Sequence, residues 1–231
     1  MNQESYPQSI PVAELDDHSR GQFIARTYSN LVTAILAFTL IEVFLFKMGF
    51  AEPMAKAMLS TSWLLVLGGF IVISWLARSV AHRAQSQAAQ YAALLGYVVG
   101  QAILFVPLLY IADRYAPGVI ASAAGITIVA FLALTAVVFV TRKDFSFLRS
   151  ILMWAGILAL VAIVAGVIFG FNLGMWFSVA MVGVAGASIL YDTSNVLHHY
   201  PEDRYVAAAL ELFASVALLF WYVLRIFLSR R

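Results

Sequence analysis

Cysteine is absent from the 231-residue sequence, which excludes disulfide bonds and thiolate chemistry but does not identify the compartment. Charge is scarce as well: charged residues make up 11% of the chain, against roughly 25% in a usual soluble domain. A soluble protein needs charge over its outer surface, whereas a helix bundle in lipid does not. Together with a hydrophobic content of 63%, the low charge predicts an integral membrane protein.

Several catalytic and ligand-binding patterns are missing too. The sequence has no Gly-rich phosphate loop, no His-Glu-x-x-His and no Gly-x-Ser-x-Gly, and His198 and His199 have no third metal ligand at a suitable spacing. The lysines are Lys47, Lys56 and Lys143, so the last hydrophobic run cannot carry a retinal Schiff base. No basic stripe with interleaved aromatics indicates a nucleic-acid partner. We therefore expect a protein that is not an enzyme and has no metal or cofactor.

Seven hydrophobic runs are candidates to cross a bilayer, for which roughly 17–25 residues are needed. In chain order they cover residues 31–48, 63–76 with an extension to 80, 91–112, 119–140, 151–169, 175–196 and 206–228. The runs are too long for membrane strands and do not alternate, and the short polar breaks between them favour antiparallel hairpins. The sequence predicts an all-α integral membrane fold, with a seven-helix transmembrane domain over residues 29–231 after a polar cytoplasmic tail over residues 1–28.

The polar tail does not resemble a signal peptide. Its polar residues include Glu4, Gln8, Glu14, Asp16, Asp17, His18, Arg20 and Arg26. The charged start, apolar core and small-residue cleavage site of a signal peptide are missing, so we expect the first run to stay in the membrane as an anchor. The tail itself is expected to be mobile, because it has few apolar residues to pack.

The distribution of Lys and Arg predicts a cytoplasmic N-terminus, since positive charge gathers on the cytoplasmic side. In this orientation the inside segments hold Arg20, Arg26, Arg78, Arg83, Arg142, Lys143, Arg149 and Arg204. The outside loops hold Lys47, Lys56 and Arg114. Arg225, Arg230 and Arg231 oppose this orientation, because seven spans place the C-terminus outside. Lys and Arg residues of the early and middle loops usually have the larger influence on orientation, so the N-terminus is expected inside.

Small residues mark expected helix contacts, because they let backbones approach closely in lipid. They are Gly96 and Gly100 in the third run, then Gly166, Gly170 and Gly174, and finally Gly183 and Gly186 in the sixth run. Residues with this spacing more often serve ordinary packing within one chain than a dedicated dimer motif.

Ionisable and polar residues inside a span are costly and each needs a reason. Glu42 either snorkels from the outer half of the first run or has a function, and Gln101 fits an interhelical hydrogen bond better than a ligand site. Asp192 and Glu211 lie on either side of the loop with His198 and His199, at one depth near the cytoplasmic side. Burial disfavours a charged carboxyl, so Asp192 is either a proton switch or a group that pairs locally at the water interface.

Three segments resemble a known family. Thr141–Leu148 resembles the family's stretch between its fourth and fifth helices. Ile189–Val196 resembles the family's sixth-helix signature, and Arg26–Tyr28 resembles the residues before the family's first span. Together they resemble the Bax inhibitor-1 (TMBIM) family of seven-helix proteins, most closely its bacterial YccA branch. The resemblance covers residues 26–225 and implies that the last helix is central and wrapped by the other six.

The resemblance also implies a candidate site for a proton switch or an ion. Calcium-leak members have a pair of intramembrane acids near the cytoplasmic side, and the first of them corresponds to Asp192. Matching residues 208–212 to the family pattern places Ser215 where the second acid would stand, as in the YccA branch. Glu211, one turn earlier, is a possible substitute, and Arg78 corresponds to the arginine partner in the second helix.

Two functions follow from the resemblance. The YccA branch implies a protein of the bacterial inner membrane that binds and restrains the membrane-anchored AAA protease FtsH. The alternative is a pH-sensitive leak for calcium or another cation, gated at Asp192 with Glu211. A hard cation needs several oxygen ligands, and one Asp with a Ser would hold it poorly, so the first function is favoured. An intramembrane enzyme lacks a nucleophile–base pair.

Overall fold

A computed structural model describes residues 10–229 of the chain. The tail residues Glu4 and Gln8 and the terminal Arg230 and Arg231 lie outside the described residues. The helices are α1 (Asp17–Lys47), α2 (Ala51–Ser60), α3 (Trp63–Arg83), α4 (Gln87–Tyr115), α5 (Val119–Thr141), α6 (Leu148–Phe169), α7 (Gly174–His198) and α8 (Tyr205–Ser229), with short 3₁₀ helices η1 (Val12–Glu14) and η2 (Glu202–Arg204).

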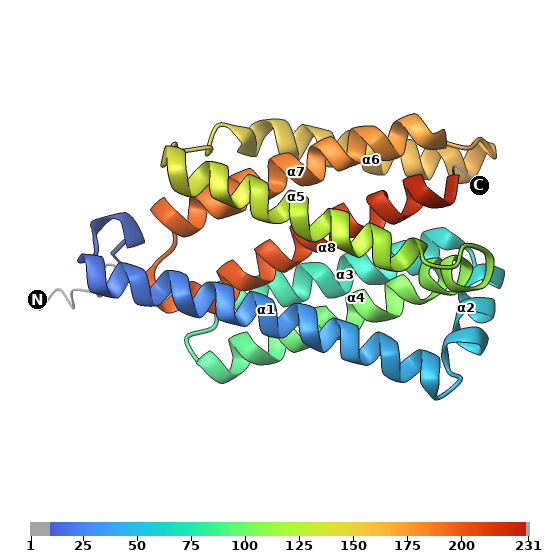
Figure 1. Ribbon diagram of the computed structural model, residues 1–231, viewed down its shortest axis with the longest axis horizontal. Helices are drawn as coiled ribbons and strands as arrows, with labels where there is room; N and C mark the ends of the chain where they lie inside the picture. Colours follow the sequence, from blue (N-terminus) through green and yellow to red (C-terminus); the bar gives the residue numbers. More distant parts are fainter. Residues whose placement is uncertain (1–9, 230–231) are drawn as a thin grey trace, which may run out of the picture.

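Seven of these helices are long and apolar enough to cross a membrane, which confirms the predicted all-α membrane bundle. They run side by side along the long axis of the molecule (Figure 1). One end carries the start of α1 and the α3–α4, α5–α6 and α7–α8 connections, and we call it the N-terminal end. The opposite end carries α2 and the end of α8.

The remaining helix, α2, occupies a stretch that the sequence assigns to a polar break. Its Ala51 and Ala55 are buried against Val106 of α4, and Lys56 pairs with Glu52 one turn earlier at 2.6 Å. Pro53 lies in the first turn, where a missing N–H costs nothing. Two small apolar residues on one face are too few to distinguish a ten-residue helix from a loop by hydropathy.

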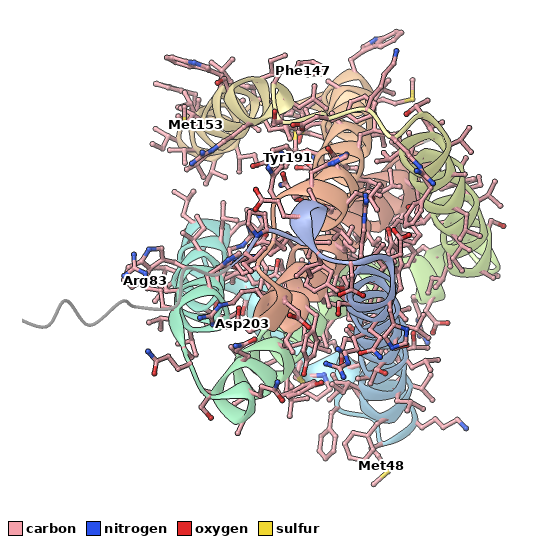
Figure 2. The ribbon with its side chains drawn as sticks, turned by 90° about the vertical axis from the view of Figure 1, so that its left-hand side faces the viewer. Met48, Arg83, Phe147, Met153, Tyr191 and Asp203 are labelled. Atoms are coloured by element: carbon pink, nitrogen blue, oxygen red, sulfur yellow. The ribbon has the colours of Figure 1, made fainter. Side chains whose placement is uncertain are left out.

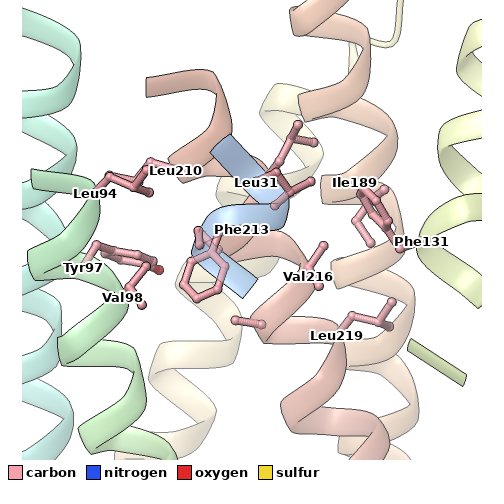
Figure 3. Packing of buried hydrophobic residues seen from close by; sticks show 14 of the residues in the cluster. Leu31, Leu94, Tyr97, Val98, Phe131, Ile189, Leu210, Phe213, Val216 and Leu219 are labelled. Carbon is pink, nitrogen blue, oxygen red and sulfur yellow. The ribbon is translucent and has the colours of Figure 1, made fainter. Parts of the chain in front are cut away.

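Helix α8 lies at the centre of the bundle, as predicted. It packs against α1, α3, α4, α5 and α7, whereas α6 packs mainly on α7 and forms the outer edge in the end-on view (Figure 2). Ala207, Ala208 and Ala209 are completely buried, and such small side chains allow close backbone approach. Further along α8, Leu210, Phe213 and Leu219 reach toward α4 and α7 (Figure 3).

The N-terminal segment is docked on the α7–α8 connection. The Val12 N–H donates to the Tyr200 carbonyl at 2.9 Å, Pro11 bridges Pro201, and Val12 is completely buried. Asp16 caps α1 by accepting from the backbone N–H groups of residues 18 and 19, and these bonds, with that to Ser19 strongest, lower the pKa of Asp16. The expectation that the tail has little to pack fails for residues 10–28.

The glycines divide into contact sites and turn sites. A methyl group added at Gly100 would lie 3.0 Å from Ile73 Cγ2 on α3, and one at Gly186 would lie 3.4 Å from Leu134 of α5. Gly96 faces open space, so it makes no such contact. Gly170 and Gly174 instead adopt positive φ angles of 71° and 68° at the α6–α7 turn, a conformation that glycine takes without strain.

Candidate functional site

Asp192 of α7 and Ser215 of α8 form a buried hydrogen bond. The Ser215 hydroxyl donates to Asp192 Oδ2 at 2.5 Å, and the two residues are 6% and 8% exposed respectively. Helices α7 and α8 pack along much of their length, which holds the two groups together. Ser215, which the resemblance places where the family's second acid would stand, therefore contacts Asp192 directly through its hydroxyl.

Glu211 lies one turn before Ser215 and has a different set of partners. It forms an ion pair with the Arg78 guanidinium of α3, and His82 Nε2 lies 3.1 Å from Glu211 Oε1. The Glu211 side chain is 14% exposed, whereas Arg78 and His82 are 44% and 41% exposed. Arg78 thus contacts Glu211, the acid that the resemblance offers only as a substitute.

The two acids have different hydrogen-bonding partners. Asp192 is held by the Ser215 hydroxyl, and Glu211 by the positive charge of Arg78. Calcium takes six to eight oxygen ligands, but across residues 10–229 no three His, Cys, Asp or Glu side chains gather closely enough to hold a metal ion. The two contacts together form a polar cluster that joins α3, α7 and α8.

A cavity of about 470 Å³ leads from the N-terminal end toward this cluster. It is lined by His82, Ser146, Arg149, Tyr191, Asn195, His199, Tyr200 and Pro201, of which Tyr191 is visible in Figure 2. His82 both lines the cavity and contacts Glu211. The polar cluster is therefore adjacent to this cavity at the end of the bundle.

The sequence did not single out His82 as a site residue, although a signal was present. His82 follows Arg78 by four residues and so shares its helix face. Its ring also stacks on Tyr200, with the ring centroids 6.0 Å apart. A cation and a histidine on one face of a spanning helix could have suggested an acidic partner, but only the structure identifies Glu211.

Two of the three segments that carry the family resemblance, Thr141–Leu148 and Ile189–Val196, contact each other. The Phe145 N–H donates to the Ser194 hydroxyl at 2.9 Å, and His199 Nε2 lies 3.0 Å from Asp144 Oδ2. Partial burial raises the pKa of Asp144, but hydrogen bonds from Ser146 and the nearby His199 outweigh this and lower it. The α5–α6 loop is thereby fastened to the end of α7, and His199 is an exposed residue that contacts Asp144.

Two further polar residues of the spans are buried. Gln101 is 5% exposed, and its side-chain carbonyl has no hydrogen-bond partner among the described residues. The interhelical hydrogen bond expected for this group is therefore not found for its oxygen. Glu42 is 6% exposed and both its carboxyl oxygens lack partners, so it does not snorkel to the membrane surface.

The sequence profile described as "Inhibitor of apoptosis-promoting Bax1" matches residues 20–231. The chain belongs to the Bax inhibitor-1 family. This finding agrees with the seven spanning helices and the central α8.

Named relatives are found in several bacteria. The chain is 32% identical over 138 residues to the "Modulator of FtsH protease YccA" of Escherichia coli K12, covering 59% of this chain and 60% of that protein. The "Inner membrane protein YccA" of Escherichia coli O6:H1 gives the same values. An uncharacterized membrane protein of Vibrio cholerae is 31% identical over 137 residues, or 59% of each chain. The chain thus spans about 60% of the length of the curated relatives it matches.

Proposed function

We propose that this protein is a non-enzymatic modulator that binds and restrains the FtsH protease in the bacterial inner membrane. Its similarity to proteins named as FtsH modulator and inner membrane protein supports the assignment. The observation that carries the proposal is the hydrogen bond from Ser215 to Asp192. It puts a hydroxyl in the position where a calcium-leak member of the family is expected to have a second acid.

The contacts of the acids argue against a cation leak as the main activity. A passing cation would need carboxylate oxygens that are free to coordinate it. Glu211 is instead engaged by Arg78 and His82, and the positive guanidinium would repel a divalent cation at this point. Both contacts of Glu211 therefore weigh against a cation leak.

The N-terminal end offers a defined surface for a protease in the same membrane. Val12 fastens residues 10–16 to the α7–α8 connection, and the basic residues Arg142 and Lys143 lie at the same end of the bundle. We place this end in the cytoplasm because it carries more of the Lys and Arg residues. A partner there would meet an ordered segment.

Co-purification with FtsH under mild detergent tests the proposal. The full chain should enrich FtsH over an unrelated seven-helix protein and slow the degradation of a membrane substrate by FtsH. Val12→Asp places a charge at a completely buried position and should weaken enrichment by releasing the docked segment. Ile10→Asp is the matched control, because Ile10 is 53% exposed.

Two comparisons distinguish failure of the proposed function from failure of the proposed contact. Equal recovery of FtsH by the full chain and by the unrelated protein would contradict the proposed function. Equal enrichment by the two Asp variants, with Val12→Asp still folded by its melting curve, would exclude only the docked segment as the contact.

A further inference from the structure

A second cavity lies toward the opposite end of the bundle, between α1, α4, α5 and α8. Its volume is about 350 Å³, within the range of small-molecule pockets. Its lining is mostly apolar and includes the rings of Phe38, Phe46, Phe213 and Phe220. Glu42, Asp113, Thr39 and Thr127 supply the polar groups. The proposed role at FtsH uses none of these residues.

Glu42 is the feature of this cavity that packing does not explain. Glu42 lies near the end of α1, is 6% exposed, and has no hydrogen-bond partner at either carboxyl oxygen among the described residues. Burying an acid without a donor or a cation is unfavourable, and more so when the acid is charged. Such a group inside a span indicates a function, with a partner that completes it.

The cavity opens toward the lipid between α1 and α5. Both helices pack on α8, which forms the floor of the cavity and is seen between them in Figure 1. At the rim, Val43 of α1 and Ile128 of α5 are 43% and 48% exposed. A ligand can therefore enter from the hydrocarbon region, which selects for an apolar molecule.

We propose that this cavity binds a lipophilic organic cation, with Glu42 as its counter-ion. Aromatic faces attract cations, increasingly so where water is excluded, and Phe38 and Phe213 lie with their ring centroids 6.1 Å apart at the cavity wall. Asp113 adds a second acidic group to the lining. The phosphate of a lipid headgroup would meet two acids of like charge, and this repulsion disfavours it.

Binding of tetraphenylphosphonium to the full chain in phosphatidylcholine nanodiscs tests the proposal. Wild-type protein should show saturable binding above the partition into empty nanodiscs, and tetraphenylborate, with the same shape and opposite charge, should show none. Glu42→Gln should weaken binding by about tenfold or more. Glu52→Gln, an exposed acid on α2 paired with Lys56, should bind as wild type does.

A second pair of variants covers the case that Glu42→Gln does not fold. Ala124→Phe on α5 places a large side chain in the cavity while Glu42 is retained, and it should abolish saturable binding. Ala121→Phe, at an exposed position one turn earlier on the same helix, should leave it unchanged. The proposal is overturned if tetraphenylborate competes as well as tetraphenylphosphonium, or if folded Glu42→Gln and Ala124→Phe both bind like wild type.

Discussion

Asp192 and Glu211 show how a helix bundle accommodates acids by two different means. Asp192 meets a neutral hydroxyl from Ser215, while Glu211 meets a guanidinium and an imidazole. Removing one partner from a buried polar pair costs more than the pair itself contributes, because the remaining group stays desolvated. The consequence can be measured at each acid separately.

Ser215→Ala removes the hydroxyl that donates to Asp192 and should lower the free energy of unfolding by about 1–3 kcal/mol. The measurement is reversible unfolding in mixed micelles with increasing SDS. Ser188→Ala on α7 is the control, since its hydroxyl donates to the Val184 carbonyl of its own helix and its loss should cost little. If the two variants unfold at the same SDS fraction, the contact with Asp192 adds no stability.

Asp144→Asn should lower stability by about 0.5–1 kcal/mol at pH 5, a small effect because the side chain is 44% exposed. The pKa of Asp144 is lowered in the fold, so its stabilisation is complete above the ordinary Asp value of about 3.9 and is lost as pH falls through the lowered pKa. Melting curves of both proteins should therefore converge at the acid end.

A control variant distinguishes this local effect from general acid sensitivity. Glu202→Gln changes an exposed acid of η2 and should melt like wild type from pH 5 downward. A constant difference between Asp144→Asn and wild type across this range would show that the stabilisation does not depend on ionisation of Asp144.

The helical pattern of the sequence predicts which residues of the site lie at the same depth, but not which of them are in contact. Depth along a span follows from counting residues at 1.5 Å each, so the sequence brings Asp192, Glu211, Ser215 and Arg78 to one region. Which acid meets which donor depends on the rotation and crossing of three helices, and no run of apolar residues encodes these. The ion pair between Arg78 and Glu211 could therefore be identified only from the structure.

The helices themselves were predictable where hydropathy changes abruptly, and less so where it does not. The runs of α5 and α6 match their helices to within a few residues. Helix α1 begins at Asp17, well before the run at 31, because its first turns lie outside the apolar region and are stabilised by the Asp16 cap. Hydropathy detects the lipid core, whereas caps and tertiary packing set the ends.

The contact of α3 with α4 gives a prediction about glycine. Gly100→Leu forces a side chain into the space of Ile73 and should destabilise the protein by about 1–3 kcal/mol. Gly96→Leu, one turn earlier on α4 and facing open space, should be tolerated. Unfolding in SDS measures both, and equal loss in the two variants would contradict close packing at Gly100.

The two ends of the molecule differ in charge, which predicts its orientation in the membrane. Because the chain has no cysteine, single cysteines can be introduced to test this orientation. With the N-terminal end in the cytoplasm, an impermeant maleimide should label Ala57→Cys on α2 in intact spheroplasts but not Ser146→Cys in the α5–α6 loop. Both positions are exposed and lie at opposite ends, and detergent should make both reactive. The reverse labelling pattern would invert the orientation.

The central position of α8 has a consequence for how the protein is made. All six other spanning helices precede α8 in the chain, so they leave the ribosome before the segment around which five of them pack. Until α8 enters the membrane, α1, α4 and α5 lack the helix on which they all pack. During biosynthesis these helices therefore enter the membrane before the helix that completes the centre of their bundle.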